Sequence, residues 1–520
     1  MNCSKISCLF VFAILFSNAQ AIQFKWGPVI EHASQTSLQI RATTDSAADV
    51  ILNYGIVFVT ENNDTISNTD SAVFALSGLV PNQVYQYTLY AGNATRTATF
   101  RTLPARGQRA HVATHGDVQG SGFWFTYYVG PSMLMQDSLD AFNAYIMTGD
   151  YINNGNAVEW DSYFNHSRLL LDHIPSFPVW GNHDVGGDMP IYNVFPEYNP
   201  LNKLYYSFDA GNAHFSVVDG SCFRNNTAQQ QWLNNDLDTS TALFKFVFCH
   251  YSPIGSGSYG MCTYAMGQIM PILDAHNVDA YFAGHKHSYE RSKPVCYGPG
   301  SPDSGMLCDN GTYFFIAGNS GQNLWDDPAT WPTAFDTGAY HGYVDIVVED
   351  SVARIQSMGA NWPSYWDAAN DWQLTDGMYF SKQYDIMNKF LVFDSVIIDK
   401  RHESSAREKG MNKTTAPWME VSPNPFNPTA RIAVSSPRFA RLASESRWAG
   451  EAGGQRAAGG EKTEIYIFNV HGKLVQKMPA DFCQLTSGIT WDASDLPSGV
   501  YVIKAMAGNV VLIKMATLLK

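Results

Sequence analysis

The chain is poor in charge and has no long apolar segment. Only 15% of its 520 residues are charged, no run of Lys or Arg occurs, and the formal net charge is -14. Such a surface does not attract nucleic acid or anionic lipid, so no stable nucleic-acid complex is expected. No stretch reaches the roughly 20 apolar residues that a transmembrane helix needs. A phosphate-containing ligand would therefore need bound metal ions as its source of positive charge.

The first residues have the pattern of an export signal. Lys5 precedes the apolar stretch 9–16, and the segment Ala19-Gln20-Ala21 is a small-x-small cleavage pattern. The apolar stretch is too short for a membrane anchor. We therefore predict a signal peptide over residues 1–21.

Cysteine is scarce, and the absence of a CxxC pair argues against a cysteine zinc site. An exported chain keeps its remaining cysteines in an oxidising environment, where disulfides form. The Gly/Pro/Ser-rich segment between Cys296 and Cys308 would close easily, so this pair is the favoured bridge. Cys222 with Cys262 is a second candidate, and Cys249 is predicted to be a buried, unbridged thiol in a strand.

The pattern of the sequence predicts three domains. Residues 22–104 show short alternating runs between Asn, Asp and Gly turns, which predict a small β-sandwich with phrases that resemble a fibronectin type III-like module. Residues 105–395 alternate strand-like runs with helical stretches such as 132–142 and 266–276, which predicts a layered α/β domain. A linker over 396–416 would lead to a second small β-sandwich over 417–520.

The residues that carry chemistry follow five apolar runs of the middle domain. These residues are Asp117 and Gln119, Asp150, Asn182-His183-Asp184, His250, and His285 with His287. Polar residues at the carboxyl ends of such strands converge on one crevice. Each signal is weak alone, because Gly-Asp is usually a turn and Asn-His can be a loop with its own hydrogen bonds. Together, in this order, they supply enough hard-to-borderline ligands for two ions of iron, manganese or zinc.

Over residues 22–395 the chain resembles the calcineurin-like metallophosphoesterases, in the arrangement of the purple acid phosphatases. The phrases at 206–215, 231–237 and 288–292 add to the ligand pattern. The resemblance implies an α/β fold, a four-layer β-sandwich flanked by helices, between the two smaller β domains. It also implies a site with two metal ions and a small phosphate-ester substrate.

The resemblance implies a role for each matching residue. Asp150 would bridge the two ions, with Asp117 and His287 on the first ion. The second ion would be held by Asn182, His250 and His285. His183 would contact the phosphate and protonate the leaving oxygen, and Asp184 would orient or tune His183.

Two positions depart from the family pattern. Purple acid phosphatases have a metal-binding tyrosine three residues after the bridging aspartate, where this chain has Asn153, and Tyr151 is out of step by two. The purple colour and the preference for ferric iron are therefore not expected. Many relatives also have a histidine at the position of Gln119. This amide could ligate the first ion through its oxygen or donate a hydrogen bond from outside the ligand set.

The end of the chain resembles the C-terminal sorting domain of type IX bacterial secretion. The phrases that carry the likeness lie at 422–429, 465–475 and 496–502. It implies contact with the secretion machinery and release to the medium or the outer cell surface. An ordinary carbohydrate-binding or spacer module is the alternative.

The sequence thus predicts a secreted acid-phosphatase-like hydrolase of phosphate monoesters, in which a metal-bound hydroxide attacks phosphorus. A phosphodiesterase or nucleotide hydrolase on the same fold is one alternative, and a non-catalytic surface binding protein is another. The candidates for lining the crevice are Tyr251, Tyr259, Lys286, Tyr289 and Arg291.

Overall fold

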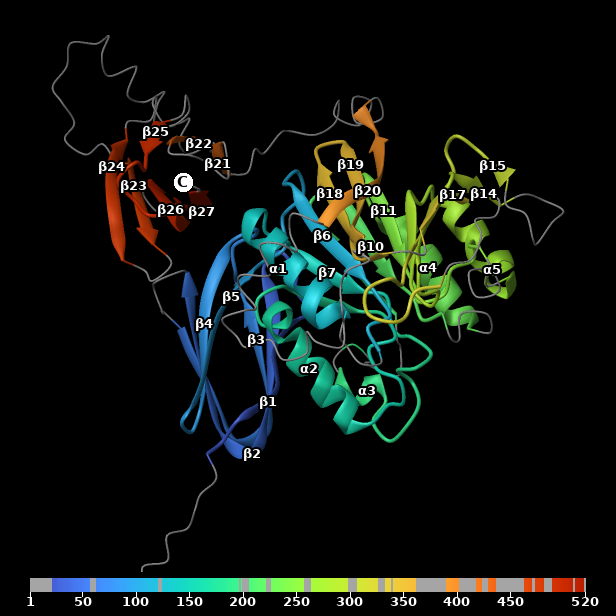
Figure 1. Cartoon of the computed structure of the whole chain (residues 1–520), viewed down its shortest axis with the longest axis horizontal. Coiled ribbons are helices and arrows are strands. Elements are labelled where there is room, and N and C mark those ends of the chain that lie inside the picture. The colour runs from blue at the N-terminus through green and yellow to red at the C-terminus, as the bar shows by residue number, and fades with distance from the viewer. Residues whose placement is uncertain are drawn as a thin grey trace, which may run out of the picture.

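Figure 1 shows the computed structural model, in which an N-terminal β domain, a central α/β domain and C-terminal β sheets follow one another along the chain. The structure describes residues 21–56, 62–119, 124–195, 198, 205–220, 226–256, 263–297, 306–325, 333–337, 340–361, 390–401, 418–422, 429–435, 463–469, 473–480, 489–507 and 510–518. The predicted signal peptide, except for residue 21, lies outside them.

The N-terminal domain is the small β-sandwich that the sequence predicts. Its strands are β1 (Phe24–Glu31), β2 (Ser37–Ile56), β3 (Asn62–Ser77), β4 (Val84–Ala91) and β5 (Ala94–Arg101), and all their pairings are antiparallel. In β4 buried and less buried residues alternate, as expected for a strand with one face on a core. The domain contacts the central one through Trp26, whose ring stacks on Phe164 and whose indole N–H donates to Asp161 at 2.6 Å.

The central domain contains two mixed sheets. The six-stranded sheet has the order β20-β19-β18-β6-β7-β8, and the seven-stranded sheet has the order β17-β13-β16-β12-β11-β10-β9. In the first, β6 (Ala110–His115), β7 (Ala144–Met147) and β8 (Ser176–Pro178) are parallel, whereas β18 (Tyr340–Glu349), β19 (Val352–Asn361) and β20 (Phe390–Asp399) run antiparallel to their neighbours.

The seven-stranded sheet is parallel at its centre. Its parallel strands are β10 (Ala213–Val217), β11 (Phe244–Phe248), β12 (Ala280–Ala283) and β16 (Tyr313–Ala317). The antiparallel strands β9 (Tyr206–Ala210), β13 (Tyr289–Ser292) and β17 (Thr333–Thr337) complete it. The central strands are almost wholly apolar and buried, as expected when both faces of a sheet are covered.

Helices flank the sheets (Figure 1), which confirms the predicted α/β fold class. A π-helical turn at Phe125–Val129 leads into α1 (Gly130–Leu139), followed by α2 (Ala157–Leu171), α3 (Ile191–Val194), α4 (Thr227–Thr239) and α5 (Thr263–Ala275). The predicted helices at 132–142 and 266–276 correspond to α1 and α5, shifted by a few residues. Helix α2 begins at Asn156, whose side chain accepts the amide N–H of Glu159. None of the described helices is long and apolar enough to cross a membrane.

A disulfide joins Cys296 to Cys308 beside the short pair β14 (Val295–Cys296) and β15 (Met306–Leu307), which confirms the favoured bridge. Cys249 is a buried thiol outside any disulfide, as predicted, but it directly follows β11 (Phe244–Phe248) instead of lying within a strand. The second candidate bridge, Cys222 with Cys262, lies outside the described residues.

The C-terminal region forms two small antiparallel sheets. One contains β21 (Trp418–Ser422), β22 (Thr429–Ser435) and β25 (Ile489–Asp492). The other contains β23 (Thr463–Asn469), β24 (Leu474–Ala480), β26 (Gly499–Ala507) and β27 (Val510–Leu518). Strand β20 extends to Asp399, so the linker predicted to begin at residue 396 starts inside a strand because apolar pairing with β19 continues that far. The other domain limits stay a prediction.

Candidate active site

The predicted site residues follow parallel strands of both sheets. Asp117 and Gln119 follow β6, Asp150 follows β7, Asn182 and His183 follow β8, His250 follows β11, and His285 and His287 follow β12. The carboxyl ends of these strands bring the loops together, and hydrogen bonds join them across the two sheets. The amide of His285 donates to Asp117 Oδ1 at 2.9 Å, and His250 Nδ1 pairs with Thr148 O at 2.8 Å.

Three of these residues have a left-handed backbone. Asp117 has a φ of 59°, Asp150 of 56° and His285 of 68°. A non-glycine residue in this region costs roughly 1–3 kcal/mol, and such strain is found mostly at functional sites. Two glycines allow the close packing: a Cβ on Gly181 would lie 2.1 Å from Asp150 Oδ1, and one on Gly284 would lie 2.4 Å from Asp117 Oδ2. The backbone is therefore shaped to present these carboxylates.

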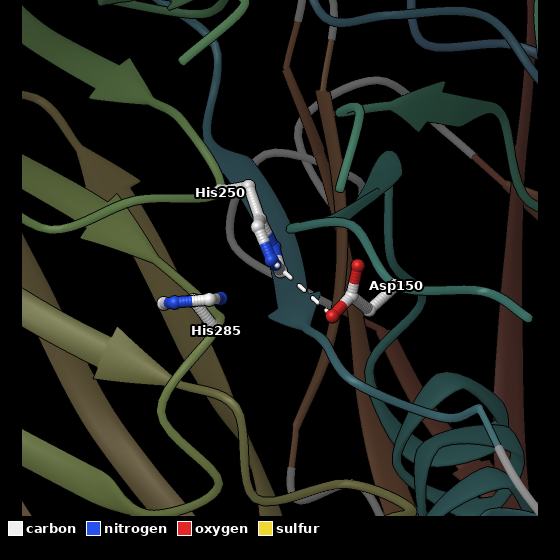
Figure 2. Close-up of side chains that lie close together, drawn as sticks. All are labelled: Asp150, His250 and His285. Carbon is white, nitrogen blue, oxygen red and sulfur yellow. Dashed lines mark ion pairs between the residues drawn. The ribbon is translucent and has the colours of Figure 1, made fainter. Parts of the chain in front are cut away.

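Asp150, His250 and His285 form the centre of the site (Figure 2), each with a ligand atom within 4.8 Å of the others. His250 Nδ1 pairs with Thr148 O at 2.8 Å, which directs Nε2 to Asp150 Oδ2 at 3.3 Å. The same Nε2 lies 3.0 Å from Asn182 Oδ1. Two oxygen acceptors therefore converge on the imidazole nitrogen, an arrangement that a proton or a bound cation makes favourable.

Asp117, Gln119 and His287 form a second group of candidate ligands next to Asp150. His287 Nε2 is 3.8 Å from Asp117 Oδ1, and Gln119 Nε2 lies 3.4 Å from His287 Nε2 and 3.3 Å from Asp150 Oδ2. Gln119 Oε1 is buried and has no hydrogen-bond partner among the described residues. A half-turn of the amide would exchange its two ends and direct the oxygen into the site. Both predicted roles of Gln119 therefore fit its position.

Burial and neighbouring charges shift the pKa of several residues of the site. Burial raises the pKa of Asp117 well above its usual range, with the negative charge of Asp150 adding to this effect. Burial acts to lower the pKa of His250, but the neighbouring carboxylate of Asp150 outweighs it and raises the value to about 9. Burial lowers the pKa of His285 and of His287 to about 4. Both are therefore neutral imidazoles with a lone pair, the form that binds a metal.

His183 is half-exposed and turned toward the centre. Its Nδ1 pairs with the carbonyl oxygen of Asn153 at 2.9 Å, and its Nε2 lies 4.0 Å from Asp150 Oδ2. Because a carbonyl only accepts, Nδ1 carries the hydrogen. The hydrogen bond that orients the ring of His183 thus comes from the backbone of Asn153, whereas Asp184 was predicted to orient or tune this histidine.

Asp184 instead binds backbone amides. Its Oδ2 accepts from Asp150 and Gly181 at 2.8 and 2.9 Å, and its Oδ1 accepts from Tyr151 at 2.8 Å and from Ile152 at 3.4 Å. This buried carboxylate fixes the loop that carries Asp150. Burial, followed by the charge of Asp150, raises the pKa of Asp184 to about 7.

Tyr151 does not reach the site. Its ring lies in an aromatic cluster, with centroids 5.9 Å from Trp160, 5.1 Å from Tyr163 and 6.0 Å from Phe195. Its hydroxyl is buried and has no hydrogen-bond partner among the described residues. Tyr151 therefore does not replace the tyrosine that is missing at Asn153.

Three of the five residues predicted to line the crevice point elsewhere. Lys286 is fully buried and pairs with Glu290 at 3.2 Å. Arg291 and the Tyr289 hydroxyl both donate to Asp394, at 2.5 and 2.9 Å for Arg291 and 2.8 Å for Tyr289. The prediction was wrong for these residues because buried carboxylates hold them, Glu290 in the case of Lys286 and the distant Asp394 in the case of Tyr289 and Arg291. Tyr251 does lie at the site, with its ring 4.7 Å from that of His285, and Tyr259 lies outside the described residues.

The segment 318–325, which sequence reasoning missed, covers one side of the site. The amide of Gln322 donates to Asp117 O at 3.0 Å, and the ring of Trp325 packs on His287 at 4.3 Å. A Cβ on Gly318 would lie 2.7 Å from Asp117 Oδ2. The glycines at 318 and 321, directly after an apolar run, are the signal that could have marked it.

Comparison with known proteins agrees with this geometry. Residues 116–289 match the calcineurin-like phosphoesterase family, and residues 420–516 match the secretion system C-terminal sorting domain. The chain thus carries a calcineurin-like phosphoesterase domain, and the metallophosphoesterases of that family are hydrolases that use metal ions. Within that family it is related to the purple acid phosphatases. Its sorting domain indicates secretion or surface location in a bacterium, with contact to the secretion machinery.

Two relatives come from Arabidopsis thaliana. Purple acid phosphatase 15 is 25% identical over 268 residues, covering 42% of this chain and 49% of that protein. Purple acid phosphatase 23 is 32% identical over 152 residues, covering 26% and 33%. The chain spans about half the length, or less, of these curated relatives.

Among solved structures, purple acid phosphatase PPD1 from yellow lupin seeds has a TM-score of 0.55 at 16% identity, covering 72% of this chain and 74% of that chain. PhoD has a TM-score of 0.51 at 16% identity, covering 64% and 85%. At this identity the two structures show the shared fold.

Proposed function

We propose that the chain is a secreted phosphatase that hydrolyses phosphate monoesters at a site for two metal ions. The observation that carries the proposal is the meeting of Asp150, His250 and His285 within 4.8 Å, at the ends of strands from both sheets. Carboxylate, imidazole and amide groups in one small site are the donor set that suits iron, manganese or zinc. The family relationship adds the reaction class.

The donors fall into two groups around Asp150, which supports two ions. Asp117 and His287 would hold the first ion, and the position of Gln119 between His287 and Asp150 makes it the candidate fourth ligand. Asn182, His250 and His285 would hold the second ion, since Asn182 Oδ1 lies 3.0 Å from His250 Nε2 and His285 lies beside them. Asp150 would bridge both.

The ions would supply an activated water nucleophile and offset the charge on the phosphate oxygens. The chain itself contributes the proton for the leaving group. With Nδ1 of His183 held by Asn153 O, Nε2 is the nitrogen that faces the site, and a proton there can pass to the departing oxygen. Such general-acid assistance is worth roughly 10²- to 10⁴-fold.

The test uses protein that begins at Ile22, loaded in turn with iron, manganese or zinc, and assayed on a chromogenic phosphate monoester and the matching diester. Metal-dependent monoester turnover that Asp150→Ala abolishes is the expected result. A preference for the diester would favour the phosphodiesterase alternative. No turnover with any metal, together with less than one ion bound per chain, would favour a surface binding protein.

His183→Ala tests the acid role. Its activity should fall more on an alkyl phosphate than on p-nitrophenyl phosphate, because p-nitrophenolate leaves without a proton. Equal losses on both substrates would contradict general-acid assistance and leave His183 as a phosphate contact.

We also propose that export removes residues 1–21 and that the domain over 417–520 directs secretion. The match to the sorting domain supports the second step. Mass spectrometry of the secreted protein should find Ile22 as its first residue, and deletion of 417–520 should retain the protein in the cell. Secretion of the deleted chain would refute the sorting role.

A further inference from the structure

Trp325 provides an aromatic surface at the edge of the site. Its ring lies 4.3 Å from the ring of His287 at a tilt of 34°, and its backbone amide donates to His287 O at 2.9 Å. The side chain is partly exposed. The indole is therefore held against a candidate metal ligand while part of it remains accessible.

The segment that carries Trp325 is tied to the loop of Asp117. The amide of Gln322 donates to Asp117 O at 3.0 Å, and Gly321 approaches so closely that a Cβ there would lie 2.6 Å from the Cα of Val118. These contacts hold in place the backbone that leads to Trp325, and the ring contact with His287 holds the indole itself. A surface fixed before binding loses little conformational entropy when a ligand settles on it.

The cations nearest to this edge in the sequence are already engaged. Lys286 forms its ion pair with Glu290, and Arg291 forms its ion pair with Asp394. Both side chains are therefore paired with carboxylates of the protein. Neither is placed to bind a second phosphate group of a substrate such as a nucleotide. At this edge of the site, the group that remains for contact with an organic part of a substrate is therefore the indole of Trp325.

We propose that Trp325 is a specificity residue that selects phosphate monoesters with an uncharged aromatic leaving group. The proposal rests on the phosphatase function above and names its substrate class as aryl phosphates. Phosphate would bind at the ions, next to His287, and the aryl ring would pack on the indole. Aromatic rings gain from such contact beyond the area that they bury.

The test compares phenyl phosphate with n-butyl phosphate in the wild type, Trp325→Ala and Trp325→Phe. The ratio of kcat/KM values, phenyl over butyl, should fall roughly 2- to 10-fold in Trp325→Ala and stay within about 2-fold in Trp325→Phe. Dividing each variant's ratio by that of the wild type removes the intrinsic difference between the leaving groups. An unchanged ratio in Trp325→Ala would overturn the proposal.

Trp232→Ala is the matched control, because this tryptophan on α4 packs on Tyr205 at 4.8 Å rather than on a site residue. Its ratio should equal that of the wild type. If Trp325→Ala merely loosened His287 and lost metal, activity would fall equally on both substrates and the metal content would drop. That result would show that Trp325 supports the structure of the metal site and does not select the substrate.

Binding gives a readout that does not need turnover. Metal-loaded protein should bind phenylphosphonate more tightly than methylphosphonate, and Trp325→Ala should remove that preference. If no ester is hydrolysed but the preference exists and depends on Trp325, the phosphatase function fails and the aromatic subsite stands. If esters are hydrolysed and no preference exists, the subsite fails and the phosphatase function stands.

Discussion

Asp184→Asn should weaken metal binding and lower stability, although it replaces none of the candidate metal ligands. The carboxylate of Asp184 accepts four backbone N–H groups, two at each oxygen, and all four are buried with it. An asparagine keeps one oxygen and places an NH₂ group against the other two donors. Each buried donor left without an acceptor costs about 1–3 kcal/mol. The free energy of unfolding of the metal-free protein should therefore fall by roughly 2–6 kcal/mol.

The larger consequence concerns metal binding. Asp150 has a φ of 56°, in the left-handed region that is sterically unfavourable for residues with a Cβ atom. Asp184 holds the amide of Asp150 in this conformation. When the two amides at one oxygen lose their acceptor, the loop can relax toward an ordinary backbone and turn the Asp150 carboxylate away from His250. We expect metal titration to show weaker binding, and the activity of the folded variant to fall with it.

The measurements are urea unfolding of the metal-free protein and calorimetric titration with the metal that supports activity. Asp345→Asn is the control, because Asp345 is also buried and bonded, to His111 on β6, but lies away from the site. The control should lose stability and keep its metal affinity. Unaltered metal affinity in Asp184→Asn would refute the positioning argument and leave Asp184 as a structural residue.

Three further changes have defined outcomes. Gly181→Ala should abolish metal binding, since its Cβ would lie 2.1 Å from Asp150 Oδ1; normal metal content in the purified variant would contradict this. Tyr151→Phe should raise the melting temperature and leave activity intact, because the hydroxyl that it removes is buried without a partner; a lower melting temperature would show that the hydroxyl is bonded. For His214, burial lowers the pKa, but Asp209 and Asp236 outweigh it and raise the value to about 9. Its stabilisation is therefore complete below pH 6.5 and lost as the pH rises through about 9, so urea unfolding should separate wild type from His214→Ala at pH 6 and much less at pH 10.

The site could be predicted largely because its chemistry depends on residue types placed at strand ends. Apolar runs that end in Gly-Asp, Asn-His or Gly-His-x-His identify both a strand and the side chain that follows it. The parallel order of those strands brings the side chains together, so Asp150, His250 and His285 could be assigned before their distances were known. The Cys296–Cys308 bridge could be predicted for a similar reason, since only a short loop separates the two.

The sequence by itself therefore determined the fold class and the sorting domain, and it predicted that Asp150, His250 and His285 meet, because local patterns of a few consecutive residues carry that information. Tertiary structure decided which polar groups are available. Arg291 and Tyr289 look like crevice residues until Asp394, more than 100 positions away, takes their hydrogen bonds. The glycines at 318 and 321 could have marked the segment, but only the tertiary structure shows that Trp325 packs on His287. A side chain's partner is fixed by how distant segments meet, and no pattern of neighbouring residues contains that information.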